Sequence, residues 1–257
     1  MQFASERRIK ARKMSKTLIL IPSRLSATRL PGKPLIKIGG KTIISRVLNI
    51  AKSAMIGEVY VATEDKRIFD HIKKNNGKAI LTKKTKTGSD RIYEAYKKLN
   101  IKGVEYILNL QGDEPFVKKK DLIKLNKESL KKKTNVSTLA CKINNKDLTK
   151  ENIVKVITKN KISNNMSSKA LNFSRIIENK KKKNIYHHIG IYLFKVSILK
   201  KFFLLKQSKK EKKNKLEQLR FLDNNIDINV FFSKNRPIGI DTKNDLKKAK
   251  KFMERNN

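Results

Sequence analysis

Residues 17–22, with the sequence TLILIP, open the pattern that decides the fold. This short apolar run is rich in β-type residues and stops at a proline, as a buried strand does. Strand-like and helix-like segments then alternate with short connections, which predicts parallel β-α units in a doubly wound sheet. The predicted strands are residues 17–22, 58–63, 78–81 and 104–110, and the predicted helices are residues 42–54, 65–75 and 90–99.

The pattern changes after Pro115. Residues 137–141, 153–158, 186–194 and 226–232 are strand-like and residues 242–254 predict a terminal helix, but the segments between them are lysine-rich and look irregular. We predict one α/β domain over residues 17–257. Its parts are a mostly parallel nucleotide-binding half (about 17–135), a smaller mixed α/β region completing an acceptor pocket (about 136–235) and a closing loop with the C-terminal helix (236–257). Residues 1–16 are interpreted as a disordered or non-native extension.

The chain is strongly basic, with 63 Lys and Arg against 22 Asp and Glu and a formal net charge of +41 over 257 residues. Such a charge invites a nucleic-acid interpretation, yet lysines occur in nearly every segment and no nucleic-acid-binding motif accompanies them. The runs at 118–120, 131–133, 180–183 and 209–213 are predicted to lie where the chain is least structured. We favour a solvated basic surface, which attracts polyanions non-specifically and suits polyphosphate and carboxylate substrates.

The single cysteine, Cys141, excludes an internal disulfide and a cysteine-based metal cage, and is interpreted as a core residue. No stretch reaches the roughly eighteen apolar residues that a membrane span needs. The basic N-terminus lacks the apolar region of a secretory signal. The sequence therefore predicts a cytoplasmic protein without membrane insertion.

A cationic loop follows the first predicted strand. Residues 21–35 read IPSRLSATRLPGKPL and contain three of the five prolines of the chain. Ligands of open α/β sheets bind beyond the carboxyl ends of strands, where this loop falls, and Arg24, Arg29 and Lys33 could clamp phosphates there. It is not a Walker A loop, because Pro34 follows the lysine. On composition alone, a basic surface turn explains the loop about as well.

Two aspartates follow other predicted strands. Asp113 lies in QGDEP (residues 111–115) and Asp241 in IGIDT (residues 238–242). Carboxylates at strand ends beside a phosphate loop suit Mg²⁺, which takes one or two carboxylates and leaves room for phosphate oxygens. Taken singly, Asp113 could belong to an ordinary Gly-Asp turn, and Asp241 is better explained as a helix cap.

Eight motifs, in this order, resemble those of the CMP-Kdo synthetases (3-deoxy-manno-octulosonate cytidylyltransferases). They run from about residue 17 to the terminal helix, and the first loop and QGDEP are the most specific. The motifs are RLSATRLPGKPL (24–35), VAT (61–63), GSDR (88–91), NLQGDEP (109–115), FSR (173–175), HIGIY (188–192), LEQLR (216–220) and GIDT (239–242).

This resemblance implies a nucleotide-diphospho-sugar transferase-like fold and a Mg²⁺-dependent enzyme. Such an enzyme transfers CMP from CTP to the anomeric hydroxyl of Kdo (3-deoxy-D-manno-octulosonate) and releases pyrophosphate, giving CMP-Kdo for lipopolysaccharide synthesis. The implied catalytic residues are Arg24, Arg29, Lys33, Asp113 and Asp241, of which the first three bind the CTP phosphates and the two aspartates ligate the metal. Further implied nucleotide contacts are Ala62, Thr63, Ser89 and Gln111. The implied sugar contacts are Arg91, Gln111, Arg175, His188, Tyr192, Glu217 and Gln218.

Within the implied sugar site, we expect Arg91, a protonated His188 and the amide of Gln111 to face the acceptor carboxylate. Without the resemblance, His188 is better interpreted as a structural histidine. The resemblance also implies a homodimer, whose contact region is unusually lysine-rich here at residues 208–215. Two alternatives remain open: a cytidylyltransferase for another acidic sugar (amino-Kdo or sialic-acid-like), and an inactive, basic nucleic-acid-binding homologue.

Overall fold

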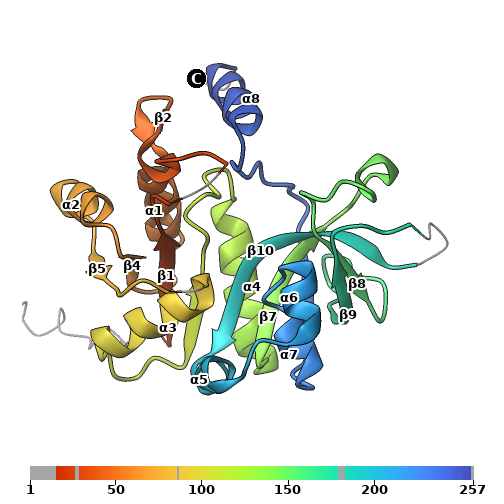
Figure 1. The fold of residues 1–257 in the computed structure, drawn as a ribbon. Helices are drawn as coiled ribbons and strands as arrows, with labels where there is room; N and C mark the ends of the chain where they lie inside the picture. The colour runs from red at the N-terminus through yellow and green to blue at the C-terminus, as the bar shows by residue number, and fades with distance from the viewer. Residues whose placement is uncertain (1–15, 27–28, 86, 179–182, 256–257) are drawn as a thin grey trace, which may run out of the picture.

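The computed structural model describes residues 16–26, 29–85, 87–178 and 183–255. The predicted extension therefore lies almost wholly outside the described residues, as do residues 180–182 of one lysine run. A nine-stranded sheet runs through the molecule in the order β5-β4-β1-β6-β10-β7-β11-β9-β8 (Figure 1). Its first four strands pair in parallel, as predicted: β1 (Thr17–Ser23), β4 (Val59–Thr63), β5 (Ala79–Leu81) and β6 (Tyr106–Asn109).

The later strands continue the same sheet with mixed directions. They are β7 (Val136–Cys141), β8 (Lys155–Thr158), β9 (Ser168–Ser174), β10 (Ile185–Lys195) and β11 (Ile228–Phe232). Strand β10 lies antiparallel between β6 and β7, although it follows both in sequence. This pairing places Tyr192 opposite Asn109 and so brings the HIGIY motif beside the strand that leads into QGDEP.

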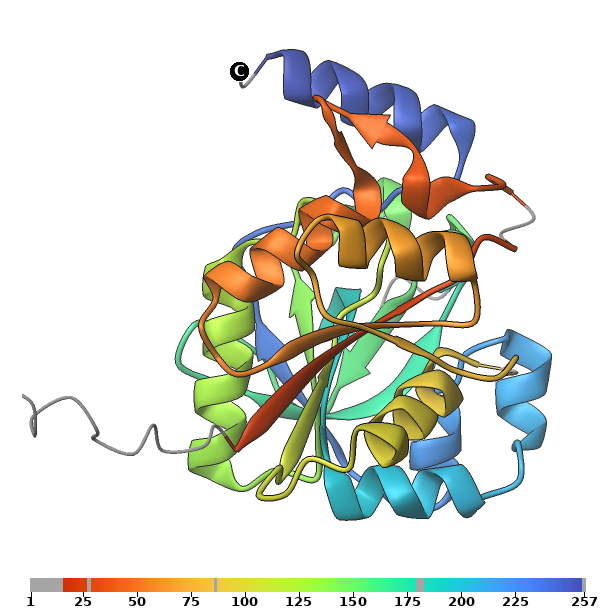
Figure 2. The same cartoon turned by 90° about the vertical axis from the view of Figure 1, so that its left-hand side faces the viewer.

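Helices cover both faces of the sheet (Figure 2). Alternate residues of β1 face opposite cores, Ile19 and Ile21 on one side and Leu18 and Leu20 on the other. The first core packs against α1 (Ile43–Ser53), α2 (Lys66–Lys74) and α4 (Lys119–Lys132), and the second against α3 (Gly88–Leu99), α5 (Val196–Leu204) and α7 (Leu219–Asp223). No helix in the described part of the chain is long and apolar enough to cross a membrane.

The lysine-rich segments are more regular than predicted. The runs at 118–120 and 131–133 begin and end α4, and the run at 209–213 lies in α6 (Lys209–Asn214). The prediction was wrong because a few buried residues suffice to fix these helices: Leu122 and Leu125 of α4 share one apolar side, and Glu211 of α6 is buried. Strand β9 was also absent from the prediction.

A small third core lies at the carboxyl ends of the first strands. The terminal helix α8 (Lys243–Glu254) packs there through Ala249 and Leu246 onto Leu30 and Ile38. Ile38 belongs to a short ribbon formed by β2 (Lys37–Ile38) and β3 (Lys41–Thr42), which lies beside α8 (Figure 2). This core joins the loop after β1 to the segment that carries Asp241.

Candidate active site

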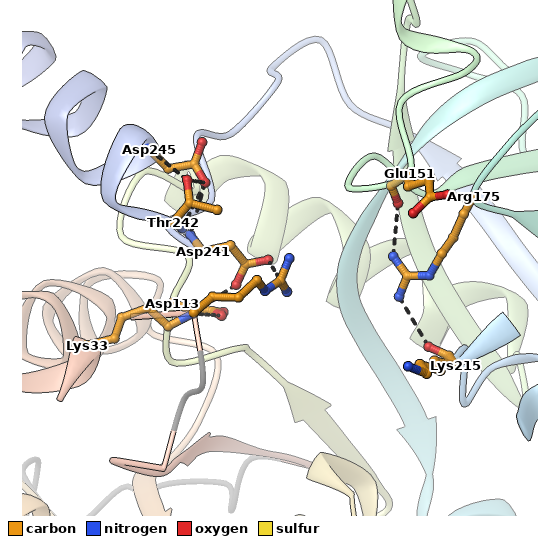
Figure 3. A network of polar contacts seen from close by, with 9 residues as sticks. Lys33, Asp113, Glu151, Arg175, Lys215, Asp241, Thr242 and Asp245 are labelled. Atoms are coloured by element: carbon orange, nitrogen blue, oxygen red, sulfur yellow. Dashed lines mark hydrogen bonds and ion pairs between the residues drawn. The ribbon is translucent and has the colours of Figure 1, made fainter. Parts of the chain in front are cut away.

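Lys33 is the centre of the cationic loop. It begins a short 3-10 helix (Lys33–Leu35) after Gly32, whose φ of 69° lies in the left-handed region that glycine favours. The Lys33 side chain is only 10% exposed, and its Nζ donates to Asp113 Oδ2 at 2.7 Å and to Asp241 Oδ1 at 2.9 Å (Figure 3). Burial alone lowers the pKa of Lys33, but the two carboxylates together outweigh it and raise the pKa, so the side chain is an ammonium ion.

The two aspartates reach Lys33 from distant segments that are tied together. Ile240 donates its backbone N–H to the carbonyl of Asp113 at 3.2 Å. A Cβ at Gly112 would lie 2.9 Å from the Pro22 carbonyl, so only glycine lets this turn pack against the end of β1. The alternative in which Asp241 caps the last helix is wrong: Thr242 is the N-cap, and its Oγ1 accepts from the Asp245 N–H at 3.1 Å.

A cavity of about 320 Å³ opens beside this cluster. It is lined by residues at the end of β1 and the start of α3 and by six charged side chains, Arg24, Arg29, Lys33, Arg91, Asp113 and Asp241. Arg24 and Arg29 are exposed, and Arg29 donates to Asp241 Oδ2 at 3.1 Å. Four cationic side chains, Arg24, Arg29, Lys33 and Arg91, make this cavity suited to a polyphosphate.

A second, larger cavity of about 800 Å³ adjoins the first and shares Gln111, Glu217 and Asp241 with it. It gathers most of the predicted sugar residues, namely Gln111, Arg175, His188, Tyr192, Glu217 and Gln218. Figure 3 shows Arg175 across the cleft from the Lys33 cluster, where its guanidinium donates to the carbonyls of Glu151 and Lys215. Ser89, a predicted nucleotide contact, lines this larger cavity.

Polar atoms without partners concentrate at the two cavities. In the described part of the chain, six buried side-chain oxygen or nitrogen atoms lack a hydrogen bond, and five belong to residues that line a cavity. Such atoms are costly to bury unless a ligand or water completes them. The five are Ser23 Oγ, Glu114 Oε2, His187 Nδ1, Tyr192 OH and Glu217 Oε2.

The expected protonation of His188 is wrong. The side chain is buried against Phe173 and Tyr192, with ring centroids 5.0 Å and 5.4 Å away, and its Nε2 lies 3.0 Å from Thr138 Oγ1. Burial, aided by the neighbouring His187, lowers the pKa of His188 to about 3. A neutral His188 can orient a sugar hydroxyl, but it offers no positive charge to a carboxylate.

We therefore expect the imidazole of His188 to stay neutral from pH 8 down to about pH 4, because its folded pKa lies below the unfolded value. NMR titration of ¹³C-labelled histidine would measure this, since the chain has three histidines and single substitutions assign them. A midpoint near 6.5, the ordinary value, would contradict the burial argument.

Arg91 also differs from expectation. Its guanidinium is buried and donates to Glu64 Oε2 at 2.9 Å and to Thr82 Oγ1 at 3.0 Å. It lines the smaller cavity rather than the one that holds His188. The structure therefore does not bring Arg91 and His188 to one cavity, because α3 directs Arg91 toward the ends of β4 and β5, and their expected grouping around one carboxylate stays a prediction.

Other predicted residues keep untested roles. Ala62 and Thr63 are fully buried at the end of β4 and line neither cavity, so their contact with the cytosine remains a prediction. Sequence reasoning missed Glu114 as a site residue, although it stands inside QGDEP. Burial, with Asp113 and Asp241 adding to it, raises the pKa of Glu114 to about 8. The sequence did contain a signal for it, because Glu114 directly follows the proposed metal ligand Asp113.

The donor set at Asp113 and Asp241 fits a hard divalent cation. In the described residues, no three His, Cys, Asp or Glu side chains form a metal-binding group. Mg²⁺ needs no such group, because it takes one or two carboxylates and fills its other positions with water and phosphate oxygens. The two carboxylates already converge on one cation, the ammonium of Lys33.

The chain is similar over most of its length to known cytidylyltransferases. The Cytidylyltransferase family model matches residues 18–228. A 3-deoxy-manno-octulosonate cytidylyltransferase of Rickettsia felis is 40% identical over 239 residues, which cover 92% of this chain and 94% of that protein. The protein of the same name from Rickettsia prowazekii is 39% identical over 241 residues, covering 93% and 96%.

Solved structures extend the comparison to the fold. A structure of CMP:2-keto-3-deoxy-manno-octonic acid synthetase complexed with CTP is 32% identical, covers 95% of this chain and 100% of that chain, and has a TM-score of 0.85. A UDP-glucose pyrophosphorylase complexed with UDP-glucose is 13% identical with a TM-score of 0.72, covering 94% and 99%, and shows a shared fold. The predicted fold class is confirmed.

Proposed function

The chain belongs to the 3-deoxy-manno-octulosonate cytidylyltransferase family, and on that premise we propose that it transfers CMP from CTP to the anomeric hydroxyl of Kdo. The observation that carries the proposal is the pair of adjoining cavities. One is lined by cations and the other by buried, unpartnered polar atoms, and both meet at Gln111, Glu217 and Asp241. An acceptor hydroxyl and a triphosphate bound in these cavities would meet at the shared wall.

The residues of the smaller cavity position the nucleotide and balance charge. Arg24, Arg29 and Lys33 hold the triphosphate, and nucleotidyl transfer depends mainly on such positioning and electrostatic stabilisation. The sugar oxygen attacks the α-phosphorus, the bond to the β-phosphate oxygen breaks, and pyrophosphate leaves with the bonding electron pair. The hydroxyl proton passes to solvent.

We propose Asp113 and Asp241 as the ligands of Mg²⁺, supported by their convergence on Lys33 Nζ. When bound, Mg²⁺ neutralises phosphate charge and lowers the pKa of the attacking hydroxyl. The neighbours of Asp241 keep it directed toward the cleft. The Ile240 N–H donates to the Asp113 carbonyl, and Thr242 is the N-cap of α8.

The residues of the larger cavity recognise the sugar. Tyr192 OH and Glu217 Oε2 lack partners in the described structure, and a polyhydroxylated ligand supplies donors and acceptors for both. Burial raises the pKa values of Tyr192 and Glu217. The Tyr192 phenol, which is protonated at neutral pH even at its ordinary pKa, can donate a hydrogen bond to the sugar. With His188 neutral, the Gln111 amide and nearby cations such as Arg175 are left to meet the acceptor carboxylate.

Pyrophosphate release from CTP with purified protein tests this function. We expect release with Kdo and Mg²⁺, and little with neutral sugars or after chelation of the metal. Preferred turnover of amino-Kdo or a sialic-acid-like sugar would select the alternative cytidylyltransferase. An absence of turnover with all acidic sugars, joined with selective nucleic-acid binding at physiological salt, would favour the inactive homologue.

Tyr192→Phe should raise the KM for Kdo about ten-fold and leave the KM for CTP nearly unchanged, because it removes one hydroxyl from the larger cavity only. Its stability should change little, since Thr138, the side chain that interacts with the hydroxyl, keeps its hydrogen bonds to the Ile189 and Ile191 carbonyls. His188→Ala should likewise raise the KM for Kdo. Steady-state kinetics with each substrate varied would measure both effects.

Tyr186→Phe is the matched control on the same strand. The Tyr186 hydroxyl accepts from the Ile162 N–H at 3.0 Å and lines neither cavity, so its loss should affect stability rather than the KM for Kdo. A His188 or Tyr192 variant that lost CTP affinity and kept sugar affinity would reverse our division of the cleft.

We also propose that the protein acts as a homodimer in the cytoplasm and supplies lipopolysaccharide synthesis, as the family resemblance implies. In the predicted contact region, α6 exposes Lys209, Lys210, Lys212 and Lys213, whose like charges oppose close association. Light scattering at low and high salt would measure the assembly, and a dimer that strengthens as salt rises would fit this charge distribution.

A further inference from the structure

Four ion-paired side chains at the centre of the nucleotide-free cleft balance one another in charge. Lys33 and Arg29 carry two positive charges, Asp113 and Asp241 carry two negative charges, and all four side chains are linked by ion pairs. Both carboxylate oxygens of Asp241 accept hydrogen bonds, Oδ1 from Lys33 and Oδ2 from Arg29. The carboxylates that would ligate a metal are therefore already neutralised by the side chains that would bind phosphate.

The turn that carries Lys33 fixes its backbone. Pro34 follows it at the start of the 3-10 helix, and the Leu35 and Ile36 N–H groups close the turn onto Gly32 and Lys33 carbonyls at 3.0 and 3.1 Å. Lys33 is 10% exposed, whereas the side chains of Asp113 and Asp241 are 35% and 44% exposed. An ion pair this sheltered is screened less by salt than a surface pair.

We propose that Lys33, assisted by Arg29, acts as the resident counter-ion of Asp113 and Asp241 and keeps a divalent cation from binding until the nucleotide arrives. A triphosphate attracts both cationic side chains and brings its own metal-binding oxygens. Phosphate binding thus frees the carboxylates at the moment when the metal is needed. The inference rests on the proposed role of the two aspartates as metal ligands.

The expected difference in metal affinity follows from the net charge of this cluster with and without Lys33. In the nucleotide-free protein, a divalent cation would approach a cluster of net charge zero whose buried member is itself a cation. With Lys33 removed, two carboxylates face each other without it, and a cation between them relieves their repulsion. Metal binding without nucleotide should therefore be weak in the wild type and strong in a variant that lacks the Lys33 charge.

Titration of Mn²⁺ into the full-length, nucleotide-free protein, followed by electron paramagnetic resonance, tests the proposal without any turnover. We expect Lys33→Met to tighten Mn²⁺ binding at least ten-fold over the wild type. Its melting temperature should be low in chelator and rise by several degrees with Mg²⁺, while that of the wild type stays nearly constant. Adding Asp113→Asn to Lys33→Met should remove the gained site.

Two further variants keep the result interpretable. Lys37→Met removes the same charge from an exposed position and should leave Mn²⁺ binding unchanged, which separates the local effect from net charge. Arg29→Gln alters an exposed residue that, among the described residues, pairs with Asp241 and not with Asp113. It should tighten binding by a smaller factor even if Lys33→Met folds poorly.

Wild-type protein that binds Mn²⁺ without nucleotide as tightly as Lys33→Met and Arg29→Gln would overturn the proposal. Failure of the proposed function is a separate result, because it would appear as absent pyrophosphate release whatever the metal titration shows.

Discussion

Asp113→Asn is expected to lower the turnover of CTP and Kdo on the order of a thousand-fold while the protein stays folded. The carboxylate is exchanged for an amide of nearly the same shape, so the turn after β6 should persist. The change removes one negative ligand from the cation site and one ion-pair partner from Lys33. Lys33 Nζ retains its contact with Asp241 Oδ1 at 2.9 Å. Asp241→Asn should have a similar effect, because Lys33 then keeps Asp113 at 2.7 Å.

Single-turnover pyrophosphate release would measure the loss, and thermal unfolding would show that the fold survives. Asp70→Asn is the matched control, since Asp70 is paired with Lys66 on the surface of α2 and lines neither cavity. Near-normal rates for either site variant at ordinary Mg²⁺ concentration would reduce that aspartate to a turn residue and contradict the proposed metal site.

Glu211→Ala is expected to lower the free energy of unfolding by about 3–5 kcal/mol, the usual cost of removing one partner of a buried ion pair. Glu211 and Arg220 are 3% and 4% exposed, and Arg220 Nε donates to Glu211 Oε2 at 2.7 Å. The guanidinium also lies over the Phe202 ring, 4.2 Å from its centroid, so the unpaired charge could not easily reach water.

The same variant should reduce activity, because Glu217 and Gln218 immediately precede the helix that carries Arg220. Urea denaturation gives the free energy of unfolding. The double variant Glu211→Ala/Arg220→Met should recover part of the loss, since it no longer buries a lone charge. Glu254→Ala, an exposed change on α8, should stay within about 0.5 kcal/mol of the wild type. A loss below 1 kcal/mol for Glu211→Ala would show that Arg220 finds another partner.

The local sequence was sufficient to predict the regular elements of the N-terminal half. The apolar run that ends at Pro22 and the helical spacing after Thr42 depend only on residues close together in the sequence. Strand β1 and helix α1 lie where these two patterns predict them. The loop after β1 and the QGDEP turn were recognisable for the same reason, since each motif is continuous in the sequence. Their resemblance to one family then supplied the fold and the reaction.

Only the tertiary structure decided how these pieces meet. Lys33 is 80 residues from Asp113 and 208 from Asp241. Its contact with Asp113 depends on the parallel pairing of β1 with β6, and its contact with Asp241 depends on the packing of the α8 segment. The same holds for the neutral state of His188 and for Glu211, a lone carboxylate in a lysine run. Periodicity and spacing report which side of an element is apolar, whereas pairing and burial of charges depend on which distant elements become neighbours. Long-range packing fixes that choice, so the sequence determined the parts of the site and the fold determined their electrostatics.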